Sequence, residues 1–141
     1  MKSGRYNVGV GLLTMALFMA YGFLLIYLRD FAPGKEQWIA EYGIGKHFES
    51  RLAHVHGNLF ALLNVGLGFV LARVRGFDRP RSIAAVLGLV GLLMPTGILM
   101  EVYLGAPPIF VLIGAMAMTA SVALSGVLAL RGWIGEPSGV A

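Results

Sequence analysis

The chain has 141 residues, of which 57% are hydrophobic and only 13% are charged. A soluble domain carries about 25% charged residues, so this composition excludes a water-facing globular domain and indicates that lipid covers much of the surface. The net charge of +4 does not indicate a nucleic-acid partner, because the basic residues stand at the ends of apolar runs, where a bilayer explains them. The absence of cysteine excludes disulfides and thiolate metal sites.

The first apolar run predicts a spanning helix over residues 8–28. It is too long for the apolar region of a signal peptide, which is roughly 7–15 residues, so we expect it to be retained. Ala32-Pro33-Gly34 ends this run, and an outer loop over residues 29–50 follows. Because Trp38 and Tyr42 favour the depth of lipid headgroups, a short interfacial helix is expected around residues 36–42.

Three further apolar runs follow, over residues 51–72, 82–103 and 109–130. Each has the roughly 20 residues that a transmembrane helix needs. The second helix has room to start as early as Lys46, and Pro95 predicts a kink in the third. We therefore expect an all-α fold, an integral membrane four-helix bundle, with residues 1–141 forming a single transmembrane domain.

The distribution of Lys and Arg predicts the orientation of this bundle. Short cytoplasmic loops are enriched in these residues. The N-terminal segment, the turn over residues 73–81 and the segment after the fourth helix carry them, whereas the loop over residues 104–108 has none. We therefore expect both termini to be cytoplasmic, in a multi-pass protein of a bacterial-type inner membrane.

Small residues predict where the helices touch, because lipid supplies no hydrophobic drive between them. On the other three helices the expected contact residues are Ala16, Ala20, Ala84, Gly88, Ala117, Ser121 and Ser125. The face of the second helix predicted to point inward has the members His54, Gly57, Asn58, Ala61, Val65 and Gly68, with Asn64 at its flank. The side predicted to face lipid has the members Leu59, Leu63, Leu67 and Val70.

All three histidines fall within residues 46–58. His54 and His56 are expected near the outer end of the second helix. The antiparallel third helix brings Glu101 and Tyr103 to the same depth, and Asp30 ends the first helix on that side. Ionisable groups at membrane depth are costly and by default indicate a function. This convergence is the strongest functional indication in the sequence.

A metal ion is one possible occupant of such a site. The candidate ligands are His54, His56, His47 and Glu101, a set that suits copper, iron or zinc. Helical residues two apart point about 200° apart, so His54 and His56 share an ion only if the backbone unwinds near Gly57. His47 and His54 lie on one face but are separated by about 10.5 Å of helical rise.

A haem and a quinone are the other possible occupants. His54 is a candidate axial ligand of haem, and the stripe of Gly57, Ala61 and Gly68 would accept a flat ring. Since the other helices contain no histidine, the second ligand would be Met100, would be absent, or would come from another protomer. A quinone would hydrogen-bond to His54 or Tyr103 and exchange a proton with Glu101.

Each of these residues also has a purely structural explanation. His54 would satisfy its ring by bonding Asn58 or a neighbouring helix. His56 would face lipid or a partner subunit, and His47 would be a solvated loop residue. Glu101 would extend its carboxylate to the membrane surface.

The segment from Arg51 to Leu59, R-L-A-H-V-H-G-N-L, resembles the second-helix R-x-x-H-x-N signature of the haem-copper oxidase superfamily, especially its nitric oxide reductase and cbb3-type branches. It is also similar to the H-A-H-L-N-L-x-G segment of small four-helix proteins labelled cytochrome oxidase subunit I-like. The resemblance implies that His54 ligates haem b, with Arg51 three residues before it. Asn58 follows four residues after His54 instead of two, where this chain has His56, and the family's later ligands are missing.

Two hypotheses follow. The first is a small redox protein with a metal or haem site around His54, with Met100, Asn58 and Arg51 as further cofactor-binding residues, which exchanges electrons with quinones or a respiratory complex. The second is a non-catalytic accessory or assembly subunit of a membrane enzyme. The expected partners are the lipid bilayer and a membrane protein or a second copy of the chain.

Overall fold

The computed structural model describes residues 3–132, and all of its regular structure is helical. The helices are α1 (Ser3–Asp30), α2 (Lys35–Ala40), α3 (Gly45–Arg73), α4 (Asp78–Gly91), α5 (Leu93–Leu104) and α6 (Ile109–Gly132). Four segments are long and apolar enough to cross a membrane: Gly4–Asp30, Gly45–Arg73, Asp78–Leu104 and Ile109–Gly132. The predicted all-α four-helix bundle is confirmed at this level.

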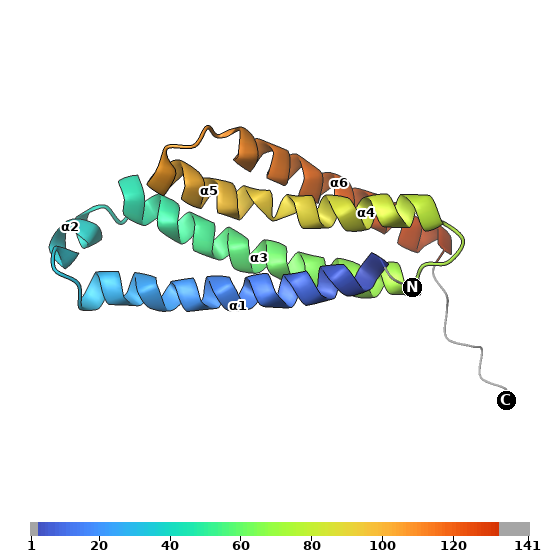
Figure 1. Cartoon of the computed structure of the whole chain (residues 1–141), viewed down its shortest axis with the longest axis horizontal. Helices are drawn as coiled ribbons and strands as arrows, with labels where there is room; N and C mark the ends of the chain where they lie inside the picture. The colour runs from blue at the N-terminus through green and yellow to red at the C-terminus, as the bar shows by residue number, and fades with distance from the viewer. Residues whose placement is uncertain (1–2, 133–141) are drawn as a thin grey trace, which may run out of the picture.

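The long helices lie side by side, and α3 runs between α1 and the α4–α5 pair (Figure 1). Helix α1 packs almost entirely on α3, and α6 packs on α4 and α5. We call the end that carries α2 the α2 end, and the end that holds the turn over residues 74–77 the Arg-rich end. The start of α1 and the end of α6 both lie at the Arg-rich end (Figure 1), where the Arg75 amide donates to the Gly132 carbonyl.

The helices are longer than predicted. Helix α3 begins at Gly45, where a positive φ of 64° and an extended Ile44 turn the chain into the helix. The predicted 29–50 loop is therefore six residues too long at its end, and the alternative start near Lys46 is the better one. The short helix expected in this loop is present as α2. Helix α4 starts at Asp78 instead of 82, because a proline such as Pro80 is tolerated in a first helical turn.

The third span is interrupted near Pro95, where a kink was predicted. Helix α4 ends at Gly91, four residues before this proline, and α5 starts at Leu93. Proline has no N–H to donate and its ring clashes with the carbonyl four residues back. The Thr96 hydroxyl donates to the Leu92 carbonyl over 2.8 Å and so satisfies one acceptor at the break.

Glycine lets α1 and α3 approach until their backbones touch. A Cβ on Gly68 would lie 2.6 Å from the Gly4 carbonyl oxygen, and one on Gly11 would lie 2.8 Å from the Ala61 carbonyl oxygen. Nearer the α2 end, the Phe18 ring fills the space over Gly57. The prediction that Gly57, Ala61 and Gly68 face inward is confirmed, since all three are buried.

Other predicted contacts were wrong. Ala16 and Ala20 are exposed, because α1 turns Gly4, Asn7, Gly11 and Phe18 towards α3 instead. Leu67, expected to face lipid, is buried at 6% exposure. The expected contacts of α4 and α6 are confirmed: Ala84, Gly88, Ala117, Ser121 and Ser125 are all buried.

Two fully buried asparagines tie three helices together. The Asn7 Nδ2 group donates to the Asn64 side-chain oxygen over 2.9 Å and to the Ala85 carbonyl over 2.8 Å. The Asn64 Nδ2 group donates to the Gly88 carbonyl over 2.8 Å. These bonds link α1, α3 and α4, and they set the rotation of α1 about its axis.

Replacing Asn64 by leucine is expected to lower the free energy of unfolding by about 1–2 kcal/mol, because buried polar partners are left unpaired. Unfolding in mixtures of mild and denaturing detergent measures this change. Asn58→Leu is the control, since its amide bonds only the His54 carbonyl of its own helix. Equal losses in the two variants would contradict a linking role for Asn64.

Candidate functional site

Helix α3 carries His47, Ser50, Arg51, His54 and His56 towards its α2 end, and it is helical throughout this stretch. Because the helix does not unwind at Gly57, the three histidines leave it in different directions. The His-x-His clip considered for His54 and His56 is therefore ruled out by this geometry. Each imidazole has its own surroundings.

His54 packs against α1. Its Nδ1 lies 2.8 Å from the Phe18 carbonyl oxygen. Its ring lies against Gly22, where an added Cβ would come within 2.7 Å of the His54 Cε1 atom. Glycine at position 22 is thus what admits the imidazole between the helices. Of the two structural partners expected for the His54 ring, Asn58 or a neighbouring helix, the neighbouring helix is the one observed. The Asn58 amide instead donates to the His54 backbone carbonyl.

A groove of about 460 Å³ between α1 and α3 opens beside His54. Its walls are Met19, Gly22, Phe23, Leu25, Ile26, His54 and Asn58. Met19 and Phe23 belong to the exposed apolar surface of α1, so the groove opens on the side that lipid would cover. Within residues 3–132 the His54 Nε2 atom has no hydrogen-bond partner, and it is not among the buried unpaired polar atoms. It is therefore accessible from the groove.

The stripe of Gly57, Ala61 and Gly68, which was predicted to accept a flat ring, does not line this groove and is covered by α1. The Phe18 ring occupies the space over Gly57, the Gly11 backbone covers Ala61, and Gly4 and Val8 cover Gly68. A haem inside the bundle does not fit this packing. Met100 is half-buried on α5 and does not line the His54 groove.

His47 is buried rather than solvated, at 4% exposure. Its Nδ1 bonds the Trp38 carbonyl of α2. Its ring stacks on the Trp38 indole at a centroid distance of 4.6 Å and meets the Tyr42 ring edge-on at 5.4 Å. The prediction of a solvated loop histidine was wrong because α2 folds back over the start of α3.

His56 bonds its own helix, with Nδ1 2.9 Å from the Leu52 carbonyl, and its ring contacts Phe60. Glu101 is exposed on α5. Asp30, also exposed, pairs with its neighbour Arg29 over 2.8 Å. No three His, Asp or Glu side chains of residues 3–132 form a group that would hold a metal ion, so His54, His56, His47 and Glu101 do not converge.

A chain of hydroxyls that the sequence did not reveal joins three helices at the α2 end. The Tyr103 hydroxyl lies 2.7 Å from the Ser50 hydroxyl and 3.4 Å from the Tyr21 hydroxyl. The Tyr21 ring in turn lies 6.4 Å from the His54 ring between centroids. Tyr103 was expected at the depth of His54, and its bond to Ser50 agrees with that placement.

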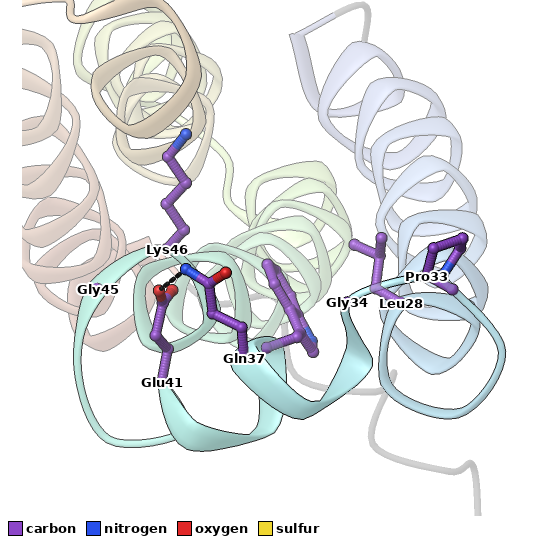
Figure 2. Close-up of a pocket in the computed structure, with 9 residues that line it drawn as sticks. Leu28, Pro33, Gly34, Gln37, Glu41, Gly45 and Lys46 are labelled. Carbon is purple, nitrogen blue, oxygen red and sulfur yellow. Dashed lines mark hydrogen bonds between the residues drawn. The ribbon is translucent and has the colours of Figure 1, made fainter.

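The Arg51 side chain of α3 packs on Tyr42, in the turn between α2 and α3, and does not line the His54 groove. Its guanidinium stands 3.7 Å over the centre of the Tyr42 ring, and Nη1 donates to the Tyr42 carbonyl over 3.1 Å. A second pocket, of about 480 Å³, lies between α2 and the adjoining ends of α1 and α3. Figure 2 shows Gln37 bonded to Glu41 on its wall, with the Lys46 side chain directed away from that carboxylate.

No protein-family model, no curated protein and no solved structure matches this chain. The resemblance of the 51–59 segment to the haem-copper oxidase signature therefore stays a prediction. The geometry singles out one histidine, His54, whose free ring nitrogen faces an apolar groove.

Proposed function

We propose that this chain is a small multi-pass membrane protein of respiratory-type electron transfer that binds a quinol at His54. The observation that carries the proposal is the 2.8 Å contact between His54 Nδ1 and the Phe18 carbonyl oxygen. A carbonyl only accepts hydrogen bonds, so Nδ1 carries the proton. In the tautomer with the proton on Nδ1, the other ring nitrogen, Nε2, is an acceptor that faces the groove.

An acceptor nitrogen in an apolar groove suits the reduced form of a quinone. A quinol hydroxyl donates a hydrogen bond, whereas a quinone carbonyl does not. The ring of such a molecule is flat and lipid-soluble, which matches a groove walled by Met19, Phe23, Leu25 and Ile26. His54 would bind and orient the hydroxyl and take up its proton when a redox centre of a partner complex removes the electrons.

The composition and topology support insertion in a bacterial-type inner membrane. Four segments are long and apolar enough to span it, and the arginines gather at the end that would be cytoplasmic. In that orientation the His54 groove lies towards the outer leaflet, and Tyr103, Tyr21 and Ser50 join it to the outer surface.

Haem b, implied by the resemblance, is the competing occupant of His54. Since the interior stripe is filled by α1, a haem would have to lie against the open side of the groove with one ligand from this chain. A quinol needs only one hydrogen-bond acceptor and an apolar wall, and His54 Nε2 and the side chains of Met19, Phe23, Leu25 and Ile26 offer these.

The test is to purify the protein in mild detergent, extract it, and measure quinone content together with a reduced-minus-oxidised visible spectrum. We expect bound quinol, measured as quinone after oxidation of the extract, in the wild type and about tenfold less in His54→Ala, since loss of roughly 1.4 kcal/mol is a factor of ten. His56→Ala, which alters a ring bonded to its own helix, should retain it. A protein free of quinone would refute the proposal, and a Soret band lost with His54 would replace quinol by haem.

The accessory-subunit hypothesis has one observation in its favour. Phe31, Ile39 and Ile44 are 73%, 50% and 71% exposed around α2, at the end of the bundle where a partner subunit would cover them. Under this hypothesis the protein holds no quinone and migrates with a larger membrane complex on native gels. Ile44→Lys would then release it from the complex, while His54→Ala would not.

A further inference from the structure

A small cavity of about 180 Å³ lies between α1, α3 and the turn that holds Tyr42, beyond the His54 groove. Its walls are Leu25, Ile26, Arg29, Tyr42, His47 and Arg51. Two of the six residues carry guanidinium groups and a third carries an imidazole. The other side of the cavity is apolar and continues into the exposed surface of α1, where Ile26 is 46% exposed.

The charges around this cavity do not cancel. Arg29 shares its Nε and one terminal nitrogen with Asp30, which is the one carboxylate paired there. Arg51 has no carboxylate within 4.0 Å among residues 3–132, where the ion pairs are Arg29 with Asp30 and Arg81 with Asp78. Its Nη1 is used by the Tyr42 carbonyl, so Nε and Nη2 are left to donate. Two cations against one anion leave a positive site.

The walls of the cavity are held in place before any ligand arrives. Arg51 stacks on Tyr42, Tyr42 meets the His47 ring, and His47 bonds the Trp38 carbonyl. The His47 side chain is almost fully buried, with 4% of its surface exposed. Its Nε2 has no hydrogen-bond partner within residues 3–132. A guanidinium held by stacking presents its donors in a fixed fork, the arrangement that binds phosphate oxygens best.

We propose that this cavity binds the phosphate of an anionic phospholipid. Arg51 donates to the phosphate through Nε and Nη2, Arg29 adds a second positive charge, and one acyl chain lies along Leu25 and Ile26. His47 forms part of the wall and contacts the Tyr42 ring on which Arg51 stacks. A phosphate group fits 180 Å³, whereas a protein segment does not. The inference rests on the membrane insertion proposed above but not on quinol binding. It does not depend on which end of the bundle is outside, because phosphate headgroups occur on both sides of a bilayer.

The test uses the full-length protein, stripped of lipid in a nonionic detergent, and follows thermal unfolding during titration with phosphatidylglycerol. We expect saturable stabilisation, and at least about tenfold weaker binding for Arg51→Gln, as loss of a charge-assisted bond predicts. Lys46→Gln is the matched control: it removes one positive charge from the same end of α3 but does not line the cavity, and it should bind as the wild type does.

Two further titrations identify the source of the phosphate. Inorganic phosphate at the same concentration should give no shift, because it lacks the acyl chain; an equal shift would show a free-anion site and overturn the lipid assignment. Phosphatidylcholine, whose headgroup has no net charge, should bind more weakly. Equal binding by wild type and Arg51→Gln, with both variants melting at the same temperature without lipid, would refute the site. If the protein holds no quinone but still binds phosphatidylglycerol through Arg51, the quinol proposal fails and the lipid site stands.

Discussion

Gly68→Leu is expected to lower the free energy of unfolding by about 3 kcal/mol, the upper end of what overpacking costs. The Cβ of residue 68 would meet the Gly4 carbonyl oxygen at 2.6 Å, and a Cβ on Gly4 would meet the Gly68 oxygen at 2.4 Å. These neighbours are backbone atoms, which cannot rotate away as a side chain does. Helix α1 would have to move off α3 and would pull Asn7 away from Asn64.

Unfolding in mixed detergent measures the loss, and Gly66→Leu is the matched control. Gly66 lies two residues away on the same helix, and a Cβ there meets nothing within 4 Å. It should leave stability nearly unchanged. If the two leucine variants unfold alike, then the close approach of α1 and α3 at the Arg-rich end is not what holds the bundle together.

Gly22→Leu is expected to weaken quinol binding by at least about tenfold, as 1.4 kcal/mol or more of overpacking predicts. A Cβ at this position would lie 2.7 Å from His54 Cε1, so the imidazole would leave the Phe18 carbonyl. The leucine side chain would also enter the groove that Gly22 lines. Because His54 is a side chain that can move, stability should change less than in Gly68→Leu.

Titration of the purified variants with a short-chain quinol measures this effect. Gly9→Leu is the control on the same helix, since a Cβ at Gly9 meets nothing within 4 Å, and it should bind as the wild type does. Undiminished binding by Gly22→Leu would place the quinol outside the groove between α1 and α3.

Much of the fold was predictable because the length and the contact face of most helices depend on residues within that helix. Apolar length predicted the four spans, Pro95 predicted the break between α4 and α5, and small residues predicted the inward faces of α3, α4 and α6. The contact face of α1 was not predictable in this way. Small residues occur on several sides of α1, and its rotation depends on what α3 and α4 offer to Asn7.

The site was predictable in location but not in composition. The antiparallel order of the helices placed the histidines and Tyr103 at one end, and Tyr103 does reach Ser50 there. The partners of His54 and His47 are backbone carbonyls, those of Phe18 and Trp38, and every residue has a carbonyl. Which one a ring meets depends on tertiary packing, so the sequence pattern alone does not reveal it.

Quinol binding, as proposed, depends on the free nitrogen of His54 accepting a hydrogen bond from the quinol hydroxyl. The most direct measurement is nitrogen-15 NMR of protein labelled at its three histidines, before and after a short-chain quinol is added in detergent. We predict that one Nε2 resonance shifts on addition, and that this resonance is the one missing from His54→Ala. A shift confined to His47 or His56, or no shift at saturating quinol, would contradict the claim.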